Sequence, residues 1–236
     1  MVYNWINSIQ RYLYPQSCLL CGSNADFETR FCQTCYEKLP FNYHACPYCA
    51  LPLPVNTAEG TRCGGCLQQQ LPYHSCITAL RYEPPLSRLI SNLKFRQHLH
   101  LTLPLAKLLI HRLAEPDDPP ELILPVPLHP RRLRERGFNQ AQEIGRVVAK
   151  HYGIPLDSRL VKRTRETSAQ SDLNEHERRR NLRNAFRIYG TLKGVNVAIL
   201  DDVVTTGSTI TELSKALNRA GADKITVWAV ARTESN

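Results

Sequence analysis

The C-terminal two thirds of the chain alternates between short apolar stretches and segments with helical spacing. Strand-like stretches occupy residues 76–83, 122–128, 159–161, 195–202 and 224–231. Between the first two, a helix face is predicted by the spacing of Leu86, Leu89, Ile90 and Leu93, and a second helix is predicted over residues 100–114. Adjacent prolines and acidic residues make 115–121 a predicted surface loop. This order predicts an α/β fold with a mostly parallel sheet.

The first 66 residues follow a different pattern, with four Cys-x-x-Cys pairs. The pairs are Cys18 and Cys21, Cys32 and Cys35, Cys46 and Cys49, and Cys63 and Cys66. Two such pairs, separated by 10 or 13 residues, can close a four-thiolate shell around Zn²⁺. We therefore expect two structural zinc ions that contribute much of the module's folding free energy. The simplest assignment joins the first pair with the second and the third with the fourth, and an interleaved arrangement stays open.

The cysteine usage also bears on the compartment. Nine cysteines in this spacing favour metal binding over disulfides, and four tandem pairs do not suit a redox motif. Cys76 stands outside the pattern and is expected to be buried. No run approaches the ~18 apolar residues of a membrane span, and the N-terminal residues lack signal-peptide features. We expect a cytoplasmic protein with a zinc module at residues 1–72 and a larger domain at 73–236, divided within the polar stretch 68–75.

Positive charge is concentrated in one segment. The chain carries 30 Lys and Arg against 21 Asp and Glu, a net charge of +9. Residues 131–187 hold 15 basic and 7 acidic residues, which is nearly all of that excess. Such a concentration attracts phosphates, in a small molecule or in a nucleic-acid backbone. A solvated arginine-rich surface is the alternative.

The segment 197–209, VAILDDVVTTGST, places chemistry at the carboxyl end of a predicted strand. An amphipathic helix follows, with Ile210, Leu213, Ala216, Leu217 and Ala220 on one face. The turn, Thr205, Thr206, Gly207, Ser208 and Thr209, can direct backbone N–H groups and hydroxyls toward an anion. Asp201 and Asp202 can accept hydrogen bonds from sugar hydroxyls or hold Mg²⁺ through water. An ordinary capped turn is the alternative, but it leaves the paired acids unexplained.

These residues resemble the phosphoribosyl-pyrophosphate (PRPP) motif of type I phosphoribosyltransferases. The resemblance implies that the turn binds the ribose 5-phosphate and that Asp201 and Asp202 contact the ribose hydroxyls, with Mg²⁺ accompanying PRPP. By the same resemblance, the loop after the strand PVPL binds pyrophosphate, through Arg131, Arg132, Arg136 and Gly137. The implied fold is a type I phosphoribosyltransferase-like, mostly parallel sheet with flanking helices, plus a small Cys-rich, double zinc-ribbon-like module.

The whole chain resembles the ComF family of competence-related proteins, which includes GntX. The CxxC pairs, RCGGCL, YEPPLSRLISNLKF, PVPLHPRRLRERGFNQA and RRRNLRNAF carry this resemblance. It implies handling of imported single-stranded DNA, with a partner such as a competence helicase or a recombination mediator. Arg178, Arg179, Arg180 and Arg183 are candidate DNA contacts on a predicted helix. Phe138, Phe186 and Tyr189 are possible stacking groups, although 185–189 alternates like a strand and favours Phe186 in the core.

Three functions therefore remain open at the level of sequence. The first is a DNA-handling accessory protein with a PRPP-type site, which accounts for the whole chain. The second is an active phosphoribosyltransferase in nucleotide salvage, although no segment for a base acceptor is recognisable. The third is a non-catalytic PRPP-sensing regulator that signals through the zinc module.

Overall fold

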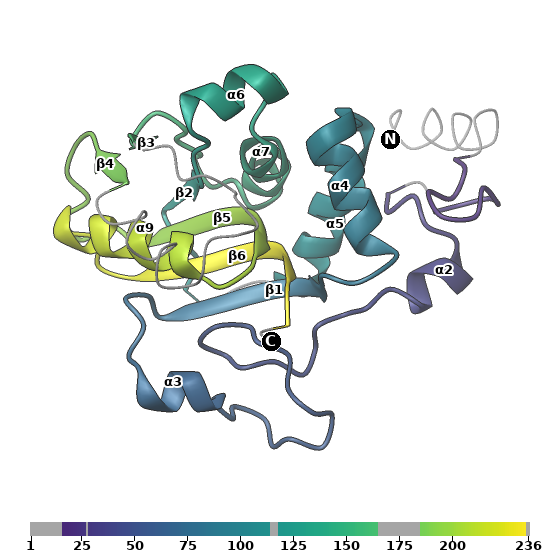
Figure 1. Ribbon diagram of the computed structural model, residues 1–236, viewed down its shortest axis with the longest axis horizontal. Coiled ribbons are helices and arrows are strands. Elements are labelled where there is room, and N and C mark those ends of the chain that lie inside the picture. The colour runs from purple at the N-terminus through teal and green to yellow at the C-terminus, as the bar shows by residue number, and fades with distance from the viewer. Residues whose placement is uncertain (1–15, 27, 114–117, 165–184, 235–236) are drawn as a thin grey trace, which may run out of the picture.

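A computed structural model describes residues 16–26, 28–113, 118–164 and 185–234, and within them a four-stranded parallel sheet forms the centre (Figure 1). Its strands are β1 (Ser75–Arg81), β2 (Leu122–Pro125), β5 (Val197–Val204) and β6 (Ile225–Arg232), in the order β1-β6-β5-β2. The two central strands are almost continuously buried, as expected for parallel strands covered on both faces. The predicted parallel sheet with flanking helices is confirmed.

Three helices cover one face of the sheet. They are α4 (Leu86–Arg96), α5 (Thr102–Leu113), which follows a short 3₁₀ turn, η1 (Leu99–Leu101), and α7 (Gln140–Tyr152). Their apolar stripes pack against alternate residues of β5 and β6, such as Leu200 and Trp228. The predicted helices at 86–93 and 100–114 are confirmed, because four or more buried leucines and isoleucines recur at helical spacing in each.

The other face is covered by α9 (Ser208–Arg219) and by an antiparallel pair, β3 (Val161–Arg163) and β4 (Phe186–Ile188). Ile210, Leu213 and Leu217 of α9 lie in the same core as Phe186, so the prediction of a core Phe186 is confirmed. The strand predicted at 159–161 begins two residues later and lies outside the parallel sheet. Strand β2 ends at Pro125 and not at residue 128. Val126 N–H still donates to Leu200 O at 2.9 Å, but Pro127 has no N–H with which to continue the ladder.

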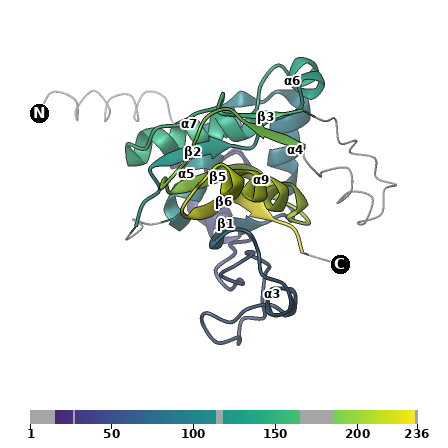
Figure 2. The ribbon, with the colours of Figure 1, turned by 90° about the vertical axis from the view of Figure 1, so that its left-hand side faces the viewer.

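The Cys-rich module lies along the free edge of β1 (Figures 1 and 2). It contains the short helices α2 (Gln33–Glu37) and α3 (Gly64–Gln68). Backbone hydrogen bonds join the module to the strand: Asn42 N–H donates to Ala79 O at 2.9 Å, and Arg81 N–H donates to Pro40 O at 2.7 Å. The module thus protects an edge that would otherwise present unpaired backbone groups. Phe31 and Leu39 belong to the same hydrophobic core as α4 and α5.

Candidate phosphate site and zinc sites

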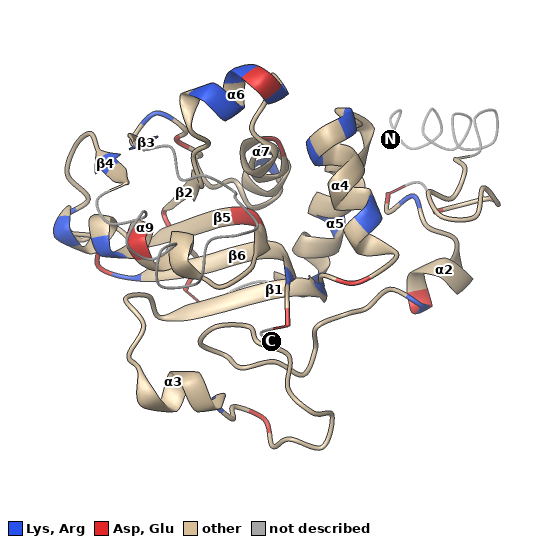
Figure 3. Ribbon diagram, viewed as in Figure 1, with Lys and Arg blue, Asp and Glu red and all other residues tan. Residues whose placement is uncertain are grey.

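The carboxyl ends of the four parallel strands meet at one edge of the sheet, where the predicted site residues gather. At this edge β5 runs into the turn before α9, and β2 runs toward α6 (Pro130–Arg136). Figure 3 shows Lys and Arg on α4 and α6, with acidic residues at the end of β5. In parallel α/β sheets ligands bind at this edge.

The turn at 205–209 is open and ready to accept an anion. Thr205 and Thr206 are exposed, and Gly207 adopts a φ of +75°, a left-handed conformation that glycine takes without steric cost. The Thr206 and Ser208 hydroxyls lie 2.8 Å apart, and Gly207 is the N-cap of the twelve-residue α9. Ser208 N–H, the first of α9, donates to Thr206 Oγ1 at 3.4 Å. The helix dipole and the N–H groups of the first turn favour negative charge at this position.

Asp201 and Asp202 have different surroundings, because successive strand residues point to opposite sides of the sheet. Asp201 is half-buried, and its Oδ1 accepts a hydrogen bond from Asp202 N–H at 2.8 Å. Burial and the adjacent carboxylate raise the pKa of Asp201 well above its ordinary value, against the opposing effect of Lys94. The structure therefore places the two acids side by side in the chain but in two different electrostatic environments.

Asp202 is the centre of a chain of polar contacts between helices. Its side chain is 3% exposed, and its Oδ2 lies 2.5 Å from Lys94 Nζ on α4. Gln140 Nε2, at the start of α7, donates to Asp202 Oδ1 at 3.2 Å. Gln140 Oε1 in turn accepts a hydrogen bond of 2.5 Å from Arg136 Nη1 on α6. Sequence reasoning missed Lys94 and Gln140, because only the fold brings them to the acids.

Helix α7 is held in register by Asn139. Its side-chain oxygen accepts from Ala141 N–H at 3.0 Å, and its amide donates to Val126 O at 3.0 Å. The first contact caps the helix, and the second ties it to the segment after β2. Asn139 thereby fixes the position of Gln140 beside Asp202.

The arginines predicted on a loop lie instead on the helix α6. His129 caps it with an acceptor for Arg131 N–H, Pro130 starts it, and Gly137 ends it at a φ of +81°. Arg131 forms an exposed pair with Glu135 at 3.0 Å. The helix explains why four arginines in six residues do not all face one point.

The guanidinium group of Arg132 nevertheless comes close enough to repel those of Arg136 and Arg163. Burial lowers the pKa of Arg136, and the positive charge of Arg132 lowers it further, while Asp202 opposes both. Arg163, at the end of β3, has its pKa lowered by burial and by Arg132, against the attraction of Asp201. Arg163 was not predicted as a site residue, since its strand joins the site only through the tertiary fold. Positive charge gathered near the two acids at this edge favours the binding of an anion.

Arg232 connects this edge of the sheet to the Cys-rich module. Its side chain is buried, and its Nε donates to Cys49 O at 3.0 Å. Its Nη1 donates to Val204 O at 3.2 Å and also to the carbonyl of Thr205 in the turn. The sequence does not predict that Arg232 joins the two loops, because this residue simply follows the apolar residues of a predicted strand.

Two four-cysteine sites fit Zn²⁺. The sulfurs of Cys18, Cys21, Cys32 and Cys35, and separately those of Cys46, Cys49, Cys63 and Cys66, lie within 4.8 Å of one another. Cys21 Sγ is 3.7 Å from Cys32 Sγ, and Cys49 Sγ is 3.5 Å from Cys63 Sγ. A tetrahedral zinc with Zn–S bonds of about 2.3 Å separates its sulfurs by about 3.8 Å. The structure therefore favours sequential pairing over the interleaved arrangement.

The ninth cysteine is separate from these sites. Cys76 is 3% exposed on β1, and burial raises the pKa of its thiol to about 12, despite the attraction of Arg232. A buried thiol of this kind stays protonated and unreactive. The expectation of a buried Cys76 is confirmed.

The predicted nucleic-acid residues fall partly outside the described part of the chain. Arg178, Arg179, Arg180 and Arg183 lie outside the described residues. Of the possible stacking groups, Phe138 packs against the core, whereas the Tyr189 ring is 46% exposed. Lys162 Nζ lies 5.0 Å from the Tyr189 ring centre, and the Arg187 guanidinium carbon lies 5.4 Å from it. Tyr189 thus presents an aromatic face between two cations.

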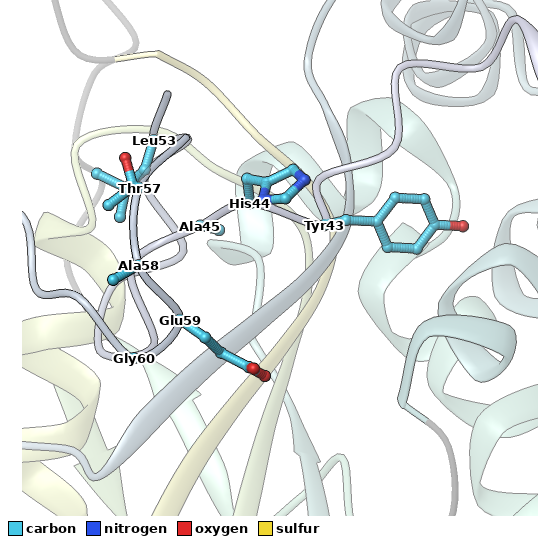
Figure 4. A pocket seen from close by; sticks show the side chains of 8 residues that line it. All are labelled: Tyr43, His44, Ala45, Leu53, Thr57, Ala58, Glu59 and Gly60. Atoms are coloured by element: carbon cyan, nitrogen blue, oxygen red, sulfur yellow. The ribbon is translucent and has the colours of Figure 1, made fainter. Parts of the chain in front are cut away.

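A hollow lies in the part of the module that carries Cys46, Cys49, Cys63 and Cys66, which we call the second Cys-rich unit, and its lining is not basic. Its lining includes Tyr43, His44 and Glu59, and Figure 4 shows the Glu59 carboxylate and the Tyr43 ring extending away from the loop. Neither Lys nor Arg lines this hollow. Its charge does not suit a phosphate ligand.

Among the described residues, no helix combines the length and the apolar character needed to cross a bilayer.

Comparisons with known proteins give a consistent assignment. A double zinc ribbon domain family matches residues 9–67. DNA utilization protein YhgH of Salmonella typhimurium (strain LT2) is 37% identical over 93% of this chain and 98% of its own. Competence protein F of Haemophilus influenzae is 33% identical over 91% of this chain and 96% of its own. A purine phosphoribosyltransferase from Pyrococcus horikoshii aligns at 19% identity over 59% of this chain and 75% of its own, with a TM-score of 0.32, which is too low to support an argument.

Proposed function

This chain belongs to the ComF family of DNA-utilisation and competence proteins, and we propose that it binds PRPP at the carboxyl edge of its sheet while handling single-stranded DNA. The observation that carries the PRPP proposal is the gathering of Arg132, Arg136 and Arg163 around the two acids that precede the exposed turn. The contacts from Arg136 through Gln140 to Asp202 are part of this arrangement. A ligand with two separate phosphate groups and a sugar diol matches this distribution of charge.

Each part of PRPP has a proposed partner. The turn 205–209 holds the 5-phosphate with its backbone N–H groups and hydroxyls. Arg132 and Arg136, with Arg131 and Gly137 on the same short helix, hold the pyrophosphate, and Mg²⁺ accompanies it as a counter-ion. Asp201 and Asp202 accept hydrogen bonds from the ribose hydroxyls.

Binding at Asp202 requires an exchange of partners. In the free protein Lys94 satisfies one Asp202 oxygen and Gln140 satisfies the other. A ribose hydroxyl that donates to Asp202 has to displace Lys94 or share the carboxylate with it. Release of the Lys94 ammonium would add positive charge to the pyrophosphate side of the site, which favours the bound state.

Calorimetry with PRPP and Mg²⁺ tests this proposal on wild-type protein and Asp202→Asn. We expect the substitution to weaken PRPP binding about tenfold or more, since one charge-assisted hydrogen bond contributes ~1.5–3 kcal/mol. Asp223→Asn is the matched control, because Asp223 is exposed and precedes β6 at the opposite edge of the sheet. A thermal scan separates lost binding from unfolding. Unchanged affinity in Asp202→Asn would remove the ribose assignment.

The DNA proposal is supported by the family and by the Tyr189 surface. Bases of any sequence can stack on an exposed aromatic ring, and the neighbouring Lys162 and Arg187 can contact phosphates. This surface belongs to the β3–β4 pair, whose connection contains the four predicted DNA-binding arginines. Stacking and phosphate contacts of this kind do not read sequence.

Titration of a fluorescent oligothymidylate across a salt series tests this surface. Tyr189→Ala should weaken binding about five- to tenfold with an unchanged salt slope, because it removes stacking and no charge. Replacement of Arg178, Arg179 and Arg180 together should instead flatten the salt slope. Tyr43→Ala, another exposed tyrosine, is the control. Wild-type affinity in Tyr189→Ala would exclude this surface.

A PRPP-sensing role is a second candidate, favoured by one contact. Arg232 joins the backbone of the second Cys-rich unit to the carbonyl of Thr205 in the proposed phosphate turn. If ligand binding moves the turn, Arg232 would therefore transmit that movement to the backbone at Cys49, which is a predicted zinc ligand. Association with a partner that depends on PRPP, without product formation, would distinguish this role.

A further inference from the structure

A hollow between α4 and α6 adjoins the proposed PRPP site. It is lined by Lys94, Phe95, Gln97, Arg132, Glu135 and Arg136, and its volume of about 330 Å³ is at the small end of ligand sites. Lys94 and Arg136 also belong to the contact chain around Asp202. Two side chains that line the hollow, Lys94 and Arg136, are therefore also part of the polar contacts that lead to Asp202.

Phe95 is the unusual member of this lining. The residue is 75% exposed, although it lies on a helix whose other large apolar residues, Leu86, Leu89, Ile90 and Leu93, are buried. Its ring is not needed by the core, and the Arg136 guanidinium carbon lies 5.6 Å from the ring centre. Gln97, which ends the helix, adopts a left-handed φ of +55°, a conformation uncommon for residues other than glycine.

An exposed aromatic ring beside Lys and Arg has a defined ligand preference. The ring face offers a stacking surface, and the cations offer phosphate contacts. A simple polyphosphate uses the cations but not the ring, whereas an apolar ligand uses the ring and leaves the cations unpaired. A nucleobase attached to a phosphate uses both.

We infer that the hollow between α4 and α6 binds the base of a nucleotide, with the base stacked on Phe95 and its phosphate near Arg132 and Arg136. This inference rests on the proposed function and adds a base-binding surface to it. The nucleotide phosphate would use the two arginines proposed for the pyrophosphate of PRPP, so the two ligands would bind there in turn. The base can come from a free nucleotide or from one residue of a DNA strand, because the chemistry recognised is the same.

Binding of deoxyadenosine monophosphate and of ribose 5-phosphate, measured by calorimetry, tests the inference. We expect Phe95→Ala to weaken binding of deoxyadenosine monophosphate about five- to a hundredfold, because base stacking on an aromatic side chain contributes ~1–3 kcal/mol. Phe95→Trp should keep it, and ribose 5-phosphate should bind all three proteins equally. Leu99→Ala, a 50% exposed apolar residue outside the lining, is the matched control.

An oligodeoxyadenylate arm separates the two sources of the base. If Phe95→Ala weakens the mononucleotide and the oligomer, the hollow takes free nucleotides as well as strands. If it weakens the oligomer alone, the base belongs to DNA. Equal binding of both by wild type and Phe95→Ala, or no binding of either by wild type, would overturn the inference.

The same experiment keeps this inference separate from the proposed PRPP function. If PRPP does not bind wild-type protein, the proposed function is contradicted. The inference about Phe95 is then still tested by the binding of deoxyadenosine monophosphate and the oligodeoxyadenylate. Unchanged PRPP binding in Phe95→Ala, together with lost nucleotide binding, would support both.

Discussion

At the scale of single residues, burial and neighbouring charge divide the roles of two consecutive acids. Asp202 is paired with Lys94 at 2.5 Å, which compensates the cost of burying its charge. Asp201 Oδ1 accepts a hydrogen bond from Asp202 N–H at 2.8 Å, and burial beside a second carboxylate raises the pKa of Asp201 despite the attraction of Lys94. Because a raised pKa means that ionisation of the carboxyl opposes folding, we expect the Asp201 charge to destabilise the free protein at neutral pH.

Asp201→Asn should stabilise the free protein. A carboxyl whose pKa is higher in the folded than in the unfolded protein makes its largest contribution to the free energy of unfolding at pH values below the unfolded-state pKa. That contribution is lost as the pH rises toward the folded-state pKa. Asparagine keeps the acceptor oxygen without the charge, so we expect a gain of about 1 kcal/mol in the free energy of unfolding at pH 8 and a smaller gain at pH 5.

Urea unfolding at both pH values checks this. Asp223→Asn, which changes an exposed carboxylate, should differ little from wild type. Loss of stability at pH 8 in Asp201→Asn would show that the Asp201 charge is compensated in the free protein.

At the scale of elements, the important contact is between the end of β6 and two loops. Arg232 reaches carbonyls of Cys49, Val204 and Thr205, so one buried side chain positions a zinc knuckle and the proposed phosphate turn together. Strand pairing sets this geometry, since Arg232 lies opposite Val204 in the β5–β6 register.

Arg232→Met should loosen both loops. Methionine fills much of the volume but removes the side-chain donor from the carbonyls of Cys49, Thr205 and Thr233, so we expect ~2–3 kcal/mol of lost stability. Val204 O keeps its hydrogen bond from Thr233 N–H at 3.1 Å. Faster zinc release to a chelating dye and weaker PRPP binding should accompany it. Arg219→Met, on the exposed end of α9, is the control. An Arg232→Met protein with wild-type zinc release and PRPP affinity would contradict this coupling.

At the scale of the whole molecule, the Cys-rich module and the sheet share packing. Cys18, Phe31 and Leu39 belong to the same core as α4, α5 and Trp228 of β6. The edge strand β1 also exchanges backbone hydrogen bonds with the module: it accepts one from Asn42 N–H and donates to the carbonyls of Pro40 and Pro47. The two parts separated by the predicted boundary at residue 72 are therefore expected to unfold together.

Chelation of zinc should consequently lower the melting temperature of the sheet as well as unfold the module. Four-thiolate sites supply folding free energy to such modules, and their loss would expose one edge of the sheet. Fluorescence of Trp228, 3% exposed, reports the sheet in a Trp5→Phe variant. An unchanged Trp228 melting curve after complete zinc removal, confirmed by metal analysis, would show that the two parts are independent.

Much of the architecture follows from local pattern. Period-3.6 apolar spacing located α4, α5 and α9, and β-rich apolar runs located β1, β5 and β6, because burial on one stripe or on both faces leaves a direct trace in the sequence. The sequence predicts a loop where the structure has the short helix α6, because none of its seven residues is buried and it therefore lacks apolar periodicity. The β3–β4 pair is equally short and carries only a weak local signal.

The chain's sequence by itself determined that four CxxC pairs suffice for two zinc sites, together with the parallel α/β fold and the turn at 205–209, whereas the structure decided which pairs share a site. Metal-ligand spacing, apolar periodicity and a strand–turn–helix junction are all properties of neighbouring residues. Only the tertiary structure decided which distant side chains surround the acids: Lys94, Gln140 and Arg163 come from three separate elements. The physical reason is that charge and hydrogen bonding act through space, and strand order and helix packing set those distances.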